Sequence, residues 1–291
     1  MKLFTAPPLS HLSRSPAGET PRDRQAACLP SAPSQLRLMP IARLAQGGRW
    51  RVEAMRALTE PCLLWFTRGQ GRITVGGTTR GYGAHNAIFI PAGVMHGFDM
   101  SPQTHGSAIF FGADCNLPLP QGALHLRIRD AASQVELNAL LEAAQRESES
   151  DRPAADRAVH HHLGLLSVWL ERQAASGAND LPAPDAARKL VARYATLLER
   201  EFRSGHGVAD YAAQLGVTPT HLTRSCRSSC GRAASDLLQD RRLYEARRLL
   251  SETRAPVKEI SEVLGYTSAA YFTRAFHART GKTPSQFRKA P

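Results

Sequence analysis

The sequence predicts a two-domain α+β protein: an N-terminal β-barrel followed by a helical pair, then an all-α C-terminal domain with two helix-turn-helix units. Three observations predict this fold class. Short β-rich runs punctuated by glycine fill residues 36–112. Helical periodicity takes over from about residue 130. A helix-turn-helix pattern near residue 260 has a second copy about 50 residues earlier.

These patterns divide the chain into five segments. We expect a disordered leader over residues 1–34, a barrel over 35–128, a helical segment over 129–176, a linker over 177–184 and an all-α domain over 185–291. The leader is rich in Pro, Ser and Ala and lacks apolar periodicity. An alternative is that it folds over a ligand pocket in the barrel.

The barrel is predicted from four β-rich runs, over residues 63–67, 71–75, 86–90 and 107–111. Glycines between short strands are typical of a small barrel or jelly roll. After the third run, Pro91, Gly93 and His96 form a Pro-x-Gly-x-x-His pattern. This pattern resembles the second half-motif of the cupin family, so the resemblance implies a cupin-like barrel.

Metal-dependent cupins also place a His-x-His pair and a carboxylate on an earlier strand, and this chain has no His between Leu36 and Gly83. One imidazole cannot hold a metal that needs three or four ligands. His85 and His105 could contribute only if the fold brought them together. We therefore expect no metal and no cofactor, but a small-molecule effector inside the barrel. The candidate lining residues are Trp65, Arg80, Tyr82, His85, Phe89 and His96.

Two helices are expected between Asp130 and about Ala175. In the second, Val159, Leu163, Leu166 and Leu170 step by four, three and four residues, as in a coiled-coil seam. We favour these residues as a homodimer interface. The alternative is that the same side chains cover the barrel.

The stretch from Val257 to Arg288 is predicted to form a helix, a turn at Gly265, a second helix and a short closing helix. Its residues Ala270–Phe276, Thr280–Gly281, Pro284 and Phe287–Arg288 resemble the AraC/XylS family of bacterial transcription regulators. The resemblance implies an AraC-type DNA-binding domain over residues 185–291, with promoter DNA and RNA polymerase as partners. It also implies an effector-responsive activator, although repression stays open.

The same unit occurs earlier, because Val208–Thr218 mirrors Val257–Thr267 and Leu222–Cys226 mirrors Phe272–Phe276. Between the copies, roughly twenty helical residues would span about 30 Å. One turn of DNA is about 34 Å long, so this spacer can set two recognition helices into successive major grooves.

The outward faces of the two recognition helices supply the candidate DNA contacts. Base-reading candidates are Thr220, His221, Thr223 and Arg224 in the first unit and Ala269, Ala270, Thr273 and Arg274 in the second. Phosphate-binding candidates are Arg227, Ser268, His277, Arg279 and Lys282. The first unit carries more polar side chains, so we expect it to discriminate more strongly between sequences.

Charge and composition favour this interpretation. The net charge is +12, and residues 182–291 hold 19 Lys/Arg against 10 Asp/Glu, which gives +9. The five cysteines have no Cys-x-x-Cys spacing, which argues against a zinc site and a disulfide scaffold. The sequence shows neither a signal-peptide core nor a long apolar run, so we expect a cytoplasmic protein without a membrane segment.

Two other functional classes remain open at this point. A cupin-type enzyme with a DNA-binding tail would need a metal, which the missing ligand pair argues against. A methyl-accepting DNA-repair regulator would need an activated Cys in a zinc-type cluster, and that spacing is absent from the sequence. We therefore expect a regulator and not an enzyme.

Overall fold

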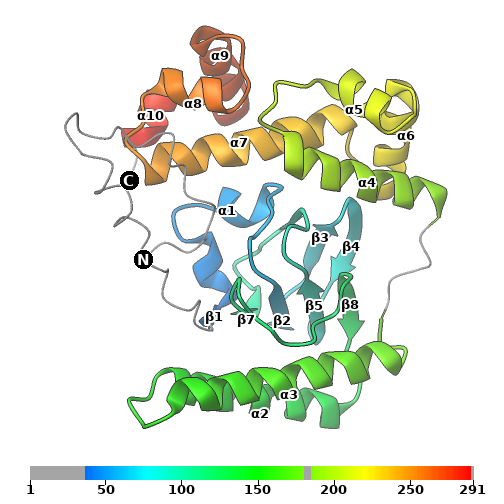
Figure 1. The fold of residues 1–291 in the computed structure, drawn as a ribbon, viewed down its shortest axis with the longest axis vertical. Helices are drawn as coiled ribbons and strands as arrows, with labels where there is room; N and C mark the ends of the chain where they lie inside the picture. Colours follow the sequence, from blue (N-terminus) through cyan, green and yellow to red (C-terminus); the bar gives the residue numbers. More distant parts are fainter. Residues whose placement is uncertain (1–36, 180–184, 290–291) are drawn as a thin grey trace, which may run out of the picture.

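The computed structural model describes residues 37–179 and 185–289. Within them lie an N-terminal domain of two antiparallel sheets and a C-terminal domain of seven helices, so the predicted two-domain α+β organisation is confirmed. The leader and residues 180–184 of the linker lie outside the described residues. In Figure 1 the sheets form a middle layer, with one helical pair on one side and the C-terminal domain on the other.

Eight strands form the two sheets. The five-stranded sheet has the order β1-β7-β2-β5-β8 and the three-stranded sheet the order β4-β3-β6, with antiparallel neighbours throughout. Their bounds are β1 Arg37–Pro40, β2 Cys62–Arg68, β3 Gly71–Val75, β4 Thr78–Tyr82, β5 Asn86–Ile90, β6 His96–Phe98, β7 His105–Phe110 and β8 Leu124–Arg127. A short 3₁₀ turn η2 (Ile41–Ala45) and the single-turn helix α1 (Trp50–Glu53) precede β2.

The five-stranded sheet is buried on both faces. Leu64 and Phe66 of β2 face the three-stranded sheet and pack with Ile73, Tyr82 and Phe98. The alternate residues Leu63 and Trp65 point to the opposite face. This explains why β2 reads as a continuous apolar run and not as an alternating pattern.

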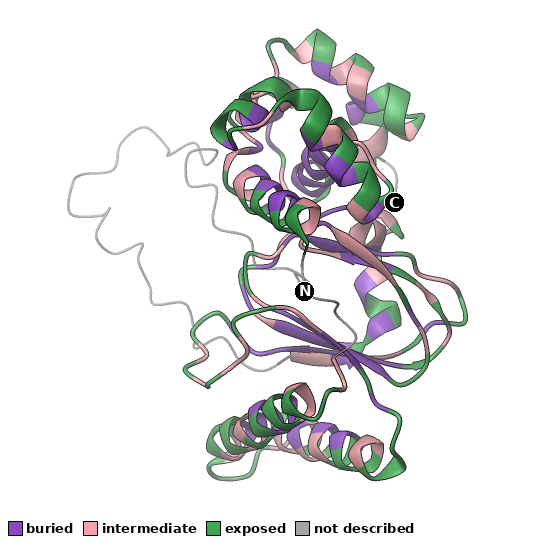
Figure 2. Cartoon of the chain, turned by 90° about the vertical axis from the view of Figure 1, so that its right-hand side faces the viewer, coloured by how far each residue is buried: buried purple, intermediate pink, exposed green. Residues whose placement is uncertain are grey.

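Helices α2 (Ala131–Ser148) and α3 (Ala155–Ala175) cover that second face. Asp130 caps α2, because its carboxylate accepts a hydrogen bond from the backbone N–H of Ser133 at 2.6 Å. Figure 2 shows the buried side of the pair turned toward the sheet and the exposed side turned away from it.

The predicted dimer seam is wrong. Its four residues are buried within one chain, in the cluster that α2 and α3 form with the five-stranded sheet: Val159, Leu163, Leu166 and Leu170. The spacing of four, three and four predicts an apolar helix face correctly, but it does not say which surface covers that face. Here the sheet covers it, which was the alternative explanation.

The C-terminal domain contains two copies of one helix pair around a spacer helix. Helix α4 (Ala186–Glu201) comes first, followed by α5 (Val208–Gln214) and α6 (Pro219–Cys230). The spacer α7 (Ala234–Glu252) leads to the second copy, and the bounds of its helices are α8 Val257–Val263, α9 Ala269–Thr280 and α10 Pro284–Lys289. At 1.5 Å per residue the 19-residue α7 is about 28 Å long.

The two copies have matching turns and caps. Gly216 and Gly265 end the first helix of each pair with φ values of 71° and 72°. Position 265 also has no room for a side chain, because a Cβ atom there would lie 2.6 Å from the Arg203 carbonyl oxygen. Thr218 and Ser268 cap the second helix of each pair through hydrogen bonds from His221 N–H and Tyr271 N–H.

None of the helices in the described ranges combines the length and hydrophobicity that a bilayer-spanning segment needs.

Candidate nucleic-acid interface and ligand cavity

Helix α6 presents one polar face to solvent. Leu222, Ser225 and Cys226 are buried on the opposite side and fix the orientation of the helix. The outward face forms a shallow depression lined by Pro219, Thr220, Thr223, Arg224 and Arg227. The structure therefore groups three predicted base-reading residues with one predicted phosphate contact. A guanidinium beside two hydroxyls on an exposed helix suits the edges of base pairs in the major groove.

Helix α9 presents a plainer surface. Phe272 and Phe276 are buried, so Ala270 and Arg274 are exposed while Ala269 and Thr273 are half-buried. The methyl groups of Ala and Thr suit the methyl group of thymine, and an exposed guanidinium such as that of Arg274 is a type of donor that suits guanine. This arrangement is consistent with weaker discrimination by the second unit, which remains a prediction.

Tyr271 is a further exposed residue of α9 that is not among the predicted contacts. It occupies the position in α9 that His221 occupies in α6, and half of its side chain is exposed beside the predicted reading face. An exposed aromatic ring on a recognition helix can contact a base or a phosphate. The 50-residue offset that pairs Thr223 with Thr273 would have identified it from sequence.

The predicted phosphate contacts surround these faces. Arg227, His277, Arg279 and Lys282 are exposed, and Ser268 lies at the N-terminus of α9. Arg279 also forms an ion pair with Asp236 at 3.5 Å, so part of its charge is already balanced. Cys226 and Cys230 are buried free thiols; burial raises the pKa of Cys226 to about 12, which disfavours the reactive thiolate.

A buried ion-pair network joins the spacer helix α7 to α4 and to the segment that follows α4. Glu245 on α7 is 2% exposed and accepts hydrogen bonds from Arg203 at 2.7 Å and Arg248 at 2.8 Å. Arg241 lies 3.4 Å from the same carboxylate and also pairs with Glu199 on α4 at 2.6 Å. Burial alone would raise the pKa of Glu245, but the surrounding guanidinium charges outweigh it and lower the pKa to about 2.

The N-terminal domain contacts both helix-turn-helix units. At the first, the Thr79 hydroxyl donates a hydrogen bond to the Cys230 carbonyl at the end of α6 at 3.3 Å. The neighbouring Gly77 lies so close to Val191 of α4 that any added Cβ would overlap the valine side chain. The β3–β4 hairpin is therefore in direct contact with α4 and with the end of α6, the helix that carries the first predicted reading face.

At the second unit, Trp50 of α1 packs its indole 5.6 Å from the ring of Tyr244 on α7 and 6.1 Å from that of Phe287 on α10. Phe287 in turn lies 5.5 Å from Phe276 of α9. The Met55 N–H donates to the Asp240 carboxylate at 2.9 Å. A row of aromatic contacts thus connects the N-terminal domain to the second recognition helix.

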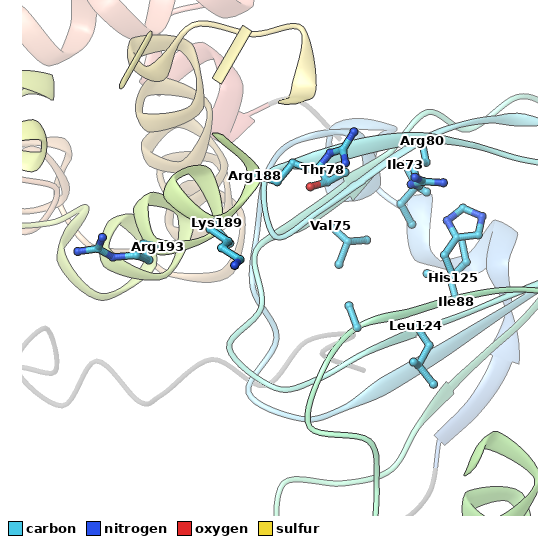
Figure 3. Close-up of a pocket in the computed structure, with 12 residues that line it drawn as sticks. Ile73, Val75, Thr78, Arg80, Ile88, Leu124, His125, Arg188, Lys189 and Arg193 are labelled. Atoms are coloured by element: carbon cyan, nitrogen blue, oxygen red, sulfur yellow. The ribbon is translucent and has the colours of Figure 1, made fainter. Parts of the chain in front are cut away.

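A cavity of about 550 Å³ lies between the two domains (Figure 3). Ile73, Val75, Ile88 and Leu124 from both sheets supply apolar walls. The remaining lining residues, from β4, β8, the segment before β8 and α4, are Thr78, Arg80, Ala123, His125, Arg188, Lys189, Ala192 and Arg193. A concave apolar site with a few polar groups, of this size, is typical of small-molecule binding sites.

Of the six residues predicted to line an effector pocket, only Arg80 lines this cavity. Trp65 and Phe89 point to the α2–α3 side, where the Trp65 indole N–H donates to Asn138 at 2.9 Å. Tyr82 stacks on Phe66 inside the sheet sandwich. The prediction failed for these residues because strand register decides which face a side chain occupies.

His85 and His96, which were also predicted to line the pocket, lie outside this cavity. His85 is exposed, in a turn with φ 62°. His96 is buried, with Nδ1 2.9 Å from the Val94 carbonyl oxygen. Burial and the nearby Arg56 charge lower its pKa to about 3, so it stays neutral. The described residues contain no cluster of three or more His, Cys, Asp or Glu that could hold a metal.

Comparison with known proteins supports the helix-turn-helix assignment. A family described as "Helix-turn-helix domain" matches residues 211–290. The arabinose operon regulatory protein of Escherichia coli is 32% identical over 85 residues, which cover 29% of each chain. The activator RhaR of Salmonella schwarzengrund is 29% identical over 147 residues, half of each chain. The C-terminal domain belongs to the AraC family. The chain spans only between about a quarter and a half of the length of the curated relatives it matches.

Two solved structures are also similar to this chain. ToxT from Vibrio cholerae, solved with an unsaturated fatty acid, is 11% identical with a TM-score of 0.43, covering 89% of this chain and 95% of ToxT. The C-terminal domain of AraT from Geobacillus stearothermophilus is 27% identical with a TM-score of 0.34, covering 37% of this chain and 88% of that one. The sequence matches, and not these TM-scores, carry the assignment of the AraC-type domain.

Proposed function

We propose that this chain is a sequence-specific transcription regulator that binds promoter DNA through α6 and α9 and responds to a small-molecule effector. The observation that carries the proposal is the pair of equivalent outward faces on an AraC-type domain, joined by a rigid spacer about 28 Å long. Because one DNA turn is about 34 Å long, both recognition helices can enter successive major grooves.

Activation through RNA polymerase follows from the family resemblance and is part of the proposal. A regulator of bacterial promoters acts where the chromosome is, so the proposal places the protein in the cytoplasm. It assigns no catalytic step to the chain.

DNA affinity should fall steeply with salt. If four or five of the exposed cationic and polar groups contact phosphates, the plot of log K against log salt should have a slope of about −4, because each contact releases condensed counterions. Fluorescence anisotropy with a labelled duplex between 50 and 300 mM salt measures this slope. A flat response would overturn the DNA-binding proposal.

We also propose a homodimer, formed through the outer face of α2 and α3 and not through the predicted seam. Leu165 is 55% exposed, Val168 37% and Val135 of α2 67%. On α3, Leu165 and Val168 continue the exposed positions of His161 and Arg172 at spacings of four, three and four. A second copy of the same face would cover these apolar side chains about a two-fold axis.

The substitution Leu165→Asp together with Val168→Asp should convert the dimer to a monomer without unfolding it, because both side chains are exposed within one chain. Sedimentation velocity measures the mass, and circular dichroism measures the melting temperature. Leu163→Ala provides the contrast: it should lower the melting temperature, since Leu163 is buried against the sheet. A double variant that remains dimeric would show that another surface carries the dimer.

A further inference from the structure

The two helix-turn-helix units contact each other directly, at the turn of the second unit. Gly265 lies in this turn, and Gly205 lies in the segment between α4 and α5, which reaches toward α8 in Figure 1. A Cβ atom added at Gly265 would lie 2.7 Å from the Gly205 Cα, and one added at Gly205 would lie 3.2 Å from the Gly265 carbonyl oxygen. Two backbones therefore meet here with no side chain between them, an approach that only glycine permits.

The equivalent glycine of the first unit makes no such contact. Gly216 has a φ of 71°, the same backbone conformation as Gly265 at 72°. A Cβ atom added at Gly216 would meet no neighbouring atom of the described residues within 4 Å. The left-handed turn explains both glycines. The closed space at position 265 has a separate cause, which is the backbone of the first unit.

Arg242 of α7 lies at the same junction, and its side chain is buried. Its Nε donates a hydrogen bond to the Phe202 carbonyl at 2.7 Å, and its Nη2 donates one to the His206 carbonyl at 3.0 Å. Its Cζ lies 5.8 Å from the ring centroid of Tyr266, the residue after Gly265. One side chain thus holds the segment of the first unit that contacts Gly265 and also contacts the second unit.

This junction constrains the two recognition helices in a way that the spacer helix does not. Helix α7 sets a distance along its own axis, whereas the rotation of each unit about that axis depends on the contacts of the unit. Gly265 lies three residues before Ser268, the cap of α9, so the junction fixes the point at which α9 begins. On the other side, the segment that Arg242 holds leads directly into α5.

We propose that Arg242 is a positioning residue for DNA recognition. Together with the contact between Gly205 and Gly265, it fixes α6 and α9 relative to each other, so that the protein requires one spacing between its two half-sites. The inference rests on the proposed function and adds the spacing requirement to it. Arg242 acts through the backbone of the first unit and the Tyr266 ring, and not by contacting DNA.

Competition binding by the full chain to a series of duplexes tests this inference. The duplexes keep both half-sites of a sequence selected from a random pool and carry none, one or two inserted base pairs between them. Each insertion moves one half-site by about 3.4 Å and rotates it by about 35° around the DNA axis. The affinity of the unsubstituted protein should fall tenfold or more for one inserted base pair.

Arg242→Gln and, separately, Gly265→Ala should reduce this spacing penalty to threefold or less and leave the base preference within each half-site unchanged. Gly216→Ala is the matched control, because it brings the same strain at positive φ without the overlap. It should keep the full penalty. Arg242→Lys retains the charge but not the fork of two hydrogen bonds, so it should relax the penalty partly.

A full spacing penalty in both Arg242 variants would overturn the inference and leave α7 as the sole determinant of spacing. Equal relaxation in Gly216→Ala and Gly265→Ala would also overturn it, since strain in either turn would then be the cause. Circular dichroism melting identifies which variants are folded, and Arg242→Lys decides the question if Arg242→Gln is not. An unsubstituted protein that binds none of the duplexes would contradict the proposed function, and this inference with it.

Discussion

Glu245→Gln is expected to lower the free energy of unfolding by about 3–5 kcal/mol, which is the cost of breaking a buried ion pair by removing one partner. Glutamine has the same shape but no charge, so Arg203 would lose the carboxylate it pairs with, and the buried Arg248 would keep only Glu252 at 3.1 Å. Arg241 would retain Glu199. Denaturant unfolding followed by circular dichroism measures the loss.

The control for this variant is Glu262→Gln, which removes an exposed carboxylate on α8 and should change the free energy of unfolding by less than about 0.5 kcal/mol. Similar effects of the two substitutions would show that the network contributes no special stability.

The same network predicts a pH dependence. The pKa of Glu245 is lowered from its ordinary value of 4.5 to about 2 in the folded protein, so its contribution is present above about pH 4.5 and is lost as the pH falls toward about 2. At 1.36 kcal/mol per pH unit, the full loss is about 3 kcal/mol. Glu245→Gln should remove this part of the acid sensitivity, and an unchanged acid profile would contradict the assignment.

Arg224→Ala is expected to weaken binding at one half-site by about 1–3 kcal/mol and to relax the sequence preference there. Arg224 is exposed on the outward face of α6, and no acidic side chain is recorded beside it in the described ranges. Its guanidinium is therefore available for a bidentate contact with guanine.

Binding to a panel of duplexes with single base changes measures this effect. The control variant is Arg157→Ala, which removes one positive charge from the exposed side of α3. Equal weakening across all sequences would instead make Arg224 a phosphate contact.

The C-terminal domain could be predicted in most of its detail because its signals are local. Gly265 marks a left-handed turn, Phe272 and Phe276 mark the buried face, and the copy 50 residues earlier fixes the equivalent positions in α6. The turn and the buried face each depend on residues within about one helical turn of one another, and the second copy is visible as a repeat in the sequence.

The ligand cavity could not be predicted because it depends on long-range pairing. Trp65 lies on the outer face of β2 because of the register of β2 with β5 and β7, and its indole N–H donates there to Asn138 of α2. Val75 and Lys189 are more than one hundred residues apart and line the same cavity because the hairpin docks on α4. The prediction of a dimer seam on α3 failed for a related reason. Periodicity identifies an apolar helix face but not the surface that covers it.

Hydroxyl-radical footprinting on a duplex selected from a random pool tests the central claim most directly. Two recognition helices in successive major grooves should protect two patches about 10 base pairs apart on one face of the DNA, with the α6 patch weakened by Arg224→Ala and the α9 patch by Arg274→Ala. A single protected patch, or two patches on opposite faces, would contradict the account.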